Sequence, residues 1–127
     1  MAHTSDRLAL LSGAILGFLA VISGALAAHG PFHDFLDSQK GLDLWKTGLN
    51  YQWYHALAMV AVGSGPYARR GTVICWLAGV ACFTGSLCIL ALDPTQHWAG
   101  PITPLGGLLL LIGWAWLFVS VLRKPAA

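Results

Sequence analysis

Three long stretches without a charged residue restrict this chain more than any other feature of its sequence. Residues 8–28 and 72–92 hold 21 residues each, and residues 105–122 hold 18. At 1.5 Å per helical residue, a stretch of 21 is about 31 Å long, which matches the hydrocarbon layer of a bilayer. The sequence therefore predicts membrane-crossing helices at 8–28, 72–92 and 105–122.

The composition agrees with a membrane protein and excludes several other classes. Hydrophobic residues make up 57% of the 127 residues and charged residues 9%, whereas disordered chains are highly charged and soluble domains carry about 25% charged residues. The formal net charge is only +2, and no stretch is rich in Lys or Arg, so nucleic acid is not an expected partner. Arg7 before an apolar run is also typical of a secretory signal, but this run exceeds the usual length of about 7–15 residues.

A fourth segment, residues 42–62, is less apolar but has a helical pattern. Asp43 and Lys46 fall on the face opposite the apolar one, so the helix would begin at the interface and then enter the bilayer. The apolar face is formed by residues at helical spacing: Leu42, Trp45, Leu49, Trp53, Ala56 and Val60.

The distribution of basic residues decides whether this fourth segment crosses. With four spans, Lys40 and Lys46 lie on one side of the membrane and the other five basic residues on the opposite side: Arg7, Arg69, Arg70, Arg123 and Lys124. With three spans, only Arg7 would remain on its side. Because cytoplasmic loops carry the excess of Lys and Arg, we expect four spans with both termini in the cytoplasm.

The first and second spans are joined by a segment that can form a short helix of its own. Gly30 and Pro31 end the first span, because Pro cannot continue a helix and restricts the residue before it. The next residues place Phe32, Phe35 and Leu36 on one face, as in a helix at the membrane interface. The expected fold is an all-α membrane protein, a four-helix transmembrane bundle with one interfacial helix, and residues 1–127 form a single domain.

Four separated sequence blocks resemble a known family. They are GALAAHG at 24–30, YQWYHALA at 51–58, GSL at 85–87, and ITPLGG at 102–107 followed by Gly113 and Trp114. In this order they resemble the domain-of-unknown-function-423 family, which includes the mitochondrial transmembrane-protein-256 group. The resemblance covers nearly the whole chain. It implies four membrane helices, a location in the bacterial inner membrane and no established reaction.

Histidines gather on the outer side of the membrane in this topology. Imidazole and carboxylate groups bind divalent metals, so the candidates for a metal site are His29, His55 and Asp93. Gly30 and Pro31 lie between His29 and His33, so these two histidines share no continuous helical face, and the chain has no H-E-x-x-H or C-x-x-C motif. The alternative is that the histidines are solvated or satisfy neighbouring polar groups, and no cofactor is expected.

His55 is the most informative of these residues, because an apolar run follows it directly. Ionisable groups at that depth face the bundle interior and find partners. Tyr51 and Gln52 precede it by four and three residues and share its helical face. We expect His29, Gln52 and His55 to form a polar junction, with His29 as the side-chain partner of His55. Trp114 lies near mid-span, where its indole N–H requires an acceptor.

Small residues mark faces on which helices can approach closely. On the first span they are Gly13, Gly17 and Gly24, and on the last they are Gly106 and Gly113. In membranes such residues stabilise association through close packing. We expect these glycines to pack the bundle, with one face left for a partner.

Three functions remain open at this stage. The first is a non-enzymatic membrane protein that forms a homo-oligomer or an accessory subunit of a larger membrane complex in the lipid bilayer. The second is a small oligomeric transporter or channel, although residues 8–28, 72–92 and 105–122 lack the embedded carboxylate that proton coupling requires. The third is a metal- or lipid-binding site at the outer histidines.

Overall fold

The part of the chain that the structure describes is all-α, with four long helices and one short α-helix. The computed structural model describes residues 4–123. Its elements are α1 (Thr4–Ala28), α2 (Pro31–Ser38), α3 (Leu42–Gly63), α4 (Arg70–Leu92), the 3-10 turn η1 (His97–Ala99) and α5 (Ile102–Leu122). The expected fold class, including the short helix between the first two spans, is confirmed.

The observed helices end where the apolar stretches end but begin earlier. The structure starts α1 at Thr4, α4 at Arg70 and α5 at Ile102. Backbone hydrogen bonding does not stop where hydrophobicity stops, so polar residues can occupy the first turn. Asp6 lies in the first turn of α1, where a carboxylate favours the positive end of the helix dipole.

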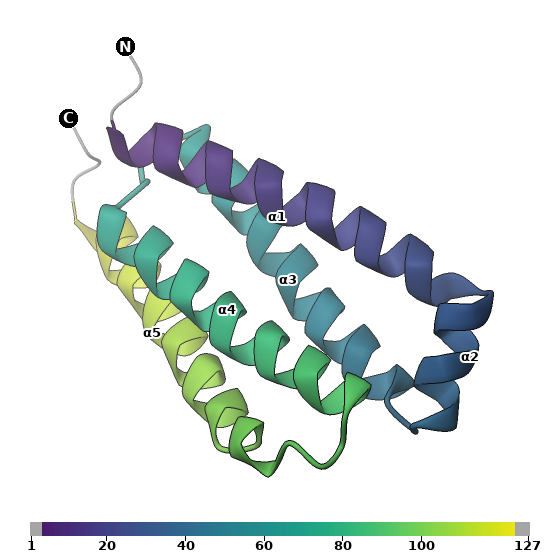
Figure 1. The fold of residues 1–127 in the computed structure, drawn as a ribbon. Coiled ribbons are helices and arrows are strands. Elements are labelled where there is room, and N and C mark those ends of the chain that lie inside the picture. The colour runs from purple at the N-terminus through teal and green to yellow at the C-terminus, as the bar shows by residue number, and fades with distance from the viewer. Residues whose placement is uncertain (1–3, 124–127) are drawn as a thin grey trace.

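Four long helices run side by side in chain order (Figure 1). The helix α3 packs against α1 and α4, and α4 packs against α5, while α1 and α5 lie on opposite sides of the molecule. Length and composition alone qualify three segments as membrane spans: Thr4–Ala28, Arg70–Leu92 and His97–Leu122. The 22 residues of α3 lie between α1 and α4 and extend about 33 Å, so this less apolar helix crosses the same layer.

Hydrophobic packing holds the helices at two levels. In the middle of the molecule, Met59, Trp76, Val80 and Leu110 form a buried cluster contributed by α3, α4 and α5. At the other level, a cluster of Ala27, Leu36 and Ala91 joins the end of α1, the helix α2 and the end of α4. Leu36 therefore anchors α2 against the bundle.

Glycines permit the closest helix contacts. A Cβ at Gly13 would lie 2.7 Å from the Ala56 carbonyl oxygen, so α1 and α3 meet there without side chains between them. At Gly106 a Cβ would collide with the backbone of Phe83, and at Gly113 with the ring of Trp76. These contacts bring α5 against α4, where small residues maximise packing between membrane helices.

The remaining two glycines of the predicted stripe are less constrained. A Cβ at Gly17 would lie 3.7 Å from the Trp53 ring, and one at Gly24 would lie 3.4 Å from Leu49. Both distances are compatible with an added methyl group. The sequence analysis did not single out Gly41, where a Cβ would collide with the Ala91 backbone.

Candidate functional site

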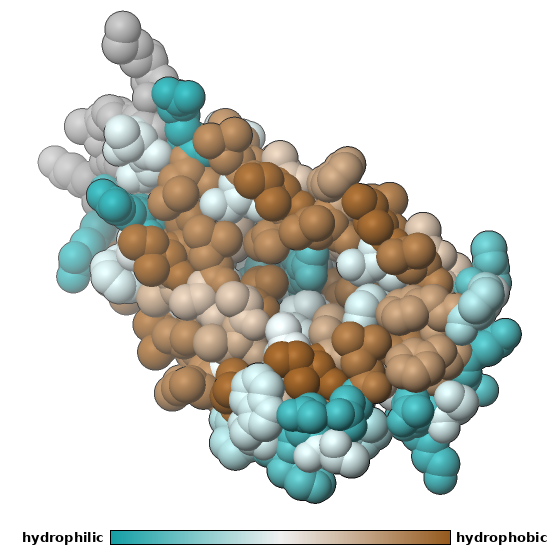
Figure 2. Space-filling view, viewed as in Figure 1, coloured by the Kyte–Doolittle hydropathy of each residue, from teal (hydrophilic) through white to brown (hydrophobic). Residues whose placement is uncertain are grey.

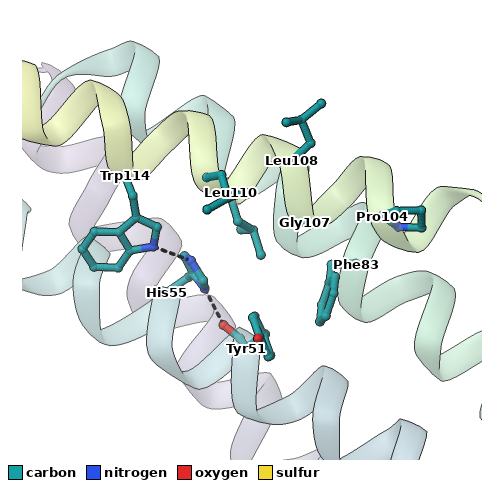
Figure 3. A pocket seen from close by; sticks show the side chains of 9 residues that line it. Tyr51, His55, Phe83, Pro104, Gly107, Leu108, Leu110 and Trp114 are labelled. Carbon is teal, nitrogen blue, oxygen red and sulfur yellow. Dashed lines mark hydrogen bonds between the residues drawn. The ribbon is translucent and has the colours of Figure 1, made fainter.

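A large cavity lies between α3, α4 and α5 and is lined by four aromatic rings and by apolar side chains of α5 (Figure 3). Its volume is about 620 Å³, within the range of about 300–1,000 Å³ that is typical of small-molecule sites. We call it the aromatic groove; its lining consists of Tyr51, His55, Phe83, Pro104, Gly107, Leu108, Leu110, Leu111 and Trp114. The exposed side chains of Leu108 and Leu111 show that one side opens at the surface of the bundle.

His55 links α3 to α5 through two hydrogen bonds, both drawn in Figure 3. Its Nδ1–H donates to the Tyr51 carbonyl oxygen over 2.7 Å, and its Nε2 accepts from the Trp114 indole N–H over 2.9 Å. A carbonyl can only accept and an indole N–H can only donate, so one tautomer satisfies both bonds: the neutral ring with its proton on Nδ1. The imidazole is 4% exposed, and both of its nitrogens are used.

Stacked and tilted rings surround this hydrogen-bonded pair. The Trp76 and Trp114 ring centroids are 4.8 Å apart, and those of Tyr51 and Phe83 are 4.5 Å apart, distances at which aromatic pairs attract each other. Trp76 is completely buried, and its Nε1–H has no hydrogen-bond partner among residues 4–123. Trp76 therefore packs against Gly113 in a position where its indole N–H makes no hydrogen bond, which costs free energy.

A second groove lies between α1 and α4, above α3. Figure 2 shows it as a hollow in an apolar surface, with a hydrophilic patch at its bottom. Its volume is about 380 Å³, and we call it the amide groove after Gln52; the lining consists of Leu16, Leu19, Ser23, Gln52, Leu77, Val80, Ala81, Thr84 and Gly85. The Gln52 Nε2–H donates to the Leu16 carbonyl over 2.7 Å, whereas its Oε1 has no hydrogen-bond partner in the described part of the chain.

The structure corrects the expected pairing of His29 with His55. His29 is exposed at the end of α1, and the nitrogens of His55 are occupied by Tyr51 and Trp114. The end of α1 is instead satisfied by His33, whose Nδ1–H donates to the Ala27 carbonyl over 2.9 Å. The physical reason is the position of α2, which folds back and places His33, not His29, under the last turn of α1.

The proposed metal ligands do not come together. Within residues 4–123, no group of three or more His, Cys, Asp or Glu residues could hold a metal ion. The Asp93 carboxylate caps the turn after α4, where it accepts hydrogen bonds from the Gln96 side chain and from the backbone and hydroxyl of Thr95. These bonds stabilise the charged form, with that from Gln96 contributing most, and they lower the pKa of Asp93.

Several residues of the aromatic groove were not singled out from the sequence. Sequence analysis recognised that Trp114 needs an acceptor but did not identify His55. It missed Phe83 on α4 entirely. A periodic signal on α5 was available, because Pro104, Gly107, Leu111 and Trp114 recur every three or four residues and share one face.

Charged side chains gather at the two ends of the bundle, and the amide groove lies between them (Figure 2). The end where α1 begins and α5 finishes carries Arg7, Arg69, Arg70 and Arg123, and the end with α2 and η1 carries Asp34, Asp37, Asp43 and Asp93. Neither groove is lined by a charged side chain.

A bundle of long apolar helices with charges confined to its ends defines a multi-pass protein of the cell membrane. The family model described as "Protein of unknown function (DUF423)" matches residues 23–107, and the chain belongs to this family, whose curated relatives are called UPF0382 membrane proteins. No solved structure matches the chain significantly.

Relatives from distant bacteria are similar over most of their length. A UPF0382 membrane protein of Staphylococcus haemolyticus is 37% identical over 121 residues, covering 92% of this chain and 97% of the relative. A UPF0382 membrane protein of Haemophilus influenzae is 41% identical, covering 80% of this chain and 82% of the relative. The UPF0382 inner membrane protein YgdD of Escherichia coli is 34% identical, covering 94% of this chain and 92% of the relative.

Proposed function

We propose that this protein is a non-enzymatic membrane component that acts by lateral association, either with itself or as an accessory subunit of a larger complex. The observation that carries the proposal is the unpaired Gln52 Oε1 in the amide groove, between two helices that cross the membrane. A hydrocarbon layer offers no hydrogen-bond donor to this atom, whereas a neighbouring transmembrane helix does.

The shape of the amide groove also favours a helix as its occupant. Ser23, Ala81 and Gly85 give its walls small side chains, which allow close approach of another backbone. Gly85 has open space before it, with no atom within 4 Å of the position of an added Cβ. A partner helix with a Ser, Thr or Asn residue would supply the donor for Gln52.

Cysteine crosslinking in native membranes tests this proposal. In a variant whose Cys75, Cys82 and Cys88 are replaced by alanine, we would introduce Gly85→Cys and add a bifunctional maleimide. We expect a crosslinked product of defined mass, a dimer or an adduct with one partner subunit. The matched control is Phe118→Cys, which lies on an exposed part of α5 outside the groove.

Two results would contradict lateral association at this groove. One is that Gly85→Cys and Phe118→Cys crosslink equally, since that pattern reflects random collision in the membrane. The other is that the native protein, purified from its own membranes in lipid nanodiscs, has the mass of one chain and no companion. Mass spectrometry of the same sample distinguishes a homo-oligomer from an accessory subunit.

A transporter is the alternative within the same architecture. Proton-coupled transporters place an ionisable residue on the substrate pathway. Neither described groove is lined by Asp, Glu, Lys or Arg, and His55, which lines the aromatic groove, has both ring nitrogens in hydrogen bonds within the chain. Substrate uptake by proteoliposomes containing the purified protein would favour this alternative.

We also propose that both termini face the cytoplasm. The four arginines at one end of the bundle support this orientation through the positive-inside rule. Reporter fusions at Ala127 and after Pro66 should both give a cytoplasmic signal. A periplasmic signal from either fusion would contradict four spans in this orientation.

A further inference from the structure

The Tyr51 hydroxyl lies in a region where the membrane offers it no partner. Tyr51 is nine residues into α3, and its ring packs against Phe83, nine residues before the end of α4. Each position is about 14 Å along its helix from the outer end, and Tyr51 lies five residues past Lys46, the last charged residue of α3, in the uncharged part of the helix. The Tyr51 hydroxyl has no hydrogen-bond partner within residues 4–123, and such a group is costly in hydrocarbon.

The other polar atoms of the aromatic groove are already used. Both nitrogens of His55 are hydrogen-bonded, one to Tyr51 and one to Trp114. An occupant therefore meets a single free donor, the phenol of Tyr51. It must be neutral, because no charged side chain lines the groove, and it must carry an oxygen acceptor at that depth.

The side chains that line the aromatic groove restrict the shape of the molecule that can bind there. Four rings line the groove, and aromatic faces and edges attract flat ring systems. The exposed flank, where Leu108 and Leu111 are 53% and 67% exposed, opens to the lipid and leaves an exit for an apolar chain. A phospholipid does not meet these requirements, since its oxygen atoms stay near the interface and its tails carry none.

We propose that the aromatic groove binds a flat, neutral, lipid-soluble ring with a carbonyl oxygen and an apolar tail, a ligand of the quinone class. The carbonyl accepts from the Tyr51 hydroxyl, the ring lies among Phe83, His55 and Trp114, and the tail leaves past Leu108. This site is separate from the amide groove and does not depend on lateral association.

Binding is measured with the protein in phosphatidylcholine nanodiscs, with decylubiquinone as the probe. Quinones quench indole fluorescence, and Trp114 lines the groove, so we expect saturable quenching on top of the linear quenching caused by partition into lipid. Tyr51→Phe should weaken the saturable phase about fivefold, the effect of one lost hydrogen bond. Tyr54→Phe is the matched control, because Tyr54 is on the same helix but outside the groove, and it should bind as the wild type does.

A second variant fills the groove without disturbing the helices. At Gly107 an added Cβ would lie 3.8 Å from the Phe83 ring, an ordinary contact, so Gly107→Leu should fold and lose the saturable phase. Its thermal unfolding compared with the wild type verifies the fold; if it does not fold, the tyrosine pair alone decides.

Three outcomes would overturn the proposal. The first is quenching that is linear in the wild type, because linear quenching reflects partition alone. The second is equal binding by Tyr51→Phe and Tyr54→Phe, which excludes the phenol as donor. The third is loss of the saturable phase when methyl palmitate is added at the same concentration as decylubiquinone, which shows that the ring is not recognised and that any acyl chain fills the groove.

Discussion

The two grooves of this protein are built on the same helix, but the buried polar side chain of each, His55 in one and Gln52 in the other, is hydrogen-bonded to a different extent. In the aromatic groove, His55 makes two hydrogen bonds and both are internal to the chain. In the amide groove, Gln52 uses one amide hydrogen and leaves its oxygen unpaired. His55 and Gln52 are three residues apart on α3, so chain position does not explain the difference.

The position of α3 within the bundle does explain it. This helix lies between α1 and α4, so Gln52 reaches α1 while His55 passes α4 and reaches α5. A helix in the middle of a row can divide one polar face between two neighbours. His55, with both nitrogens hydrogen-bonded, stabilises the bundle, whereas the free oxygen of Gln52 can accept a hydrogen bond from a molecule outside it.

The largest expected effect on stability comes from forcing α5 away from α4, two helices that line the aromatic groove. Gly106→Leu should prevent the close contact of α5 with α4, because even a Cβ collides with the Phe83 backbone. The expected cost is at or above the upper end of the range of about 1–3 kcal/mol for overpacking. The measurement is the yield of folded protein and its thermal unfolding in detergent.

Gly107→Leu is the control for this prediction, since it adds the same side chain one residue later, where there is room. If both variants fold equally well, α5 does not depend on the contact at Gly106.

The second largest effect on stability is expected from removing the hydrogen bond between Trp114 and His55. Trp114→Phe keeps an aromatic ring, although a smaller one, and removes the donor to His55 Nε2. We expect a loss of about 1 kcal/mol of stability, since an unpaired buried acceptor costs about 1–3 kcal/mol and hydrogen bonds in membranes average about 0.6 kcal/mol. Thermal unfolding measures it, with Trp116→Phe as the control: Trp116 is half exposed, and its N–H has no partner within the described chain. Equal losses would mean that the His55 bond is not stabilising.

A smaller effect on folding is expected in the amide groove. Gln52→Met removes the bond to the Leu16 carbonyl, which also lies in the helical ladder of α1, so the expected loss is only about 0.5 kcal/mol. The same variant should clearly weaken the Gly85→Cys crosslink, because the acceptor for a partner helix is gone. Asn50→Leu, at an exposed position of α3, should change neither quantity. If Gln52→Met strongly lowered stability and left the crosslink unchanged, Gln52 would stabilise the bundle and would not bind a partner helix.

The smallest effect is expected at Gly17, on the face of α1 that lies against Trp53 of α3. Gly17→Ala should leave stability within about 0.5 kcal/mol of the wild type or raise it, because the methyl group has room beside Trp53 and alanine favours a helix by about 1 kcal/mol. Gly13→Ala should destabilise, since its Cβ would lie 2.7 Å from the Ala56 carbonyl. Equal melting temperatures of the two variants would show that the α1–α3 contact adjusts.

Sequence reasoning identified the side chains that need partners better than it identified the partners. It placed His55 at a depth where it must be hydrogen-bonded, and it required an acceptor for Trp114. It did not join the two, because they are 59 residues apart and no local rule relates α3 to α5. It also treated Gly13 and Gly17 as equivalent, since a stripe of small residues does not reveal which position touches a backbone.

The sequence by itself determined the number of α-helices, the last residues of α1, α4 and α5, and the location of the charges. These properties depend on hydrocarbon thickness, on proline and glycine at the breaks, and on the cost of charge in lipid, which act on each segment separately. Only the tertiary structure decided that His33, not His29, satisfies the end of α1, that His55 pairs with Trp114, and that Gln52 keeps a free oxygen. The physical reason is that all apolar helices are equally soluble in lipid, so hydrophobicity does not decide which helices pack together. Close contacts at small residues decide it, as at Gly13, Gly106 and Gly113.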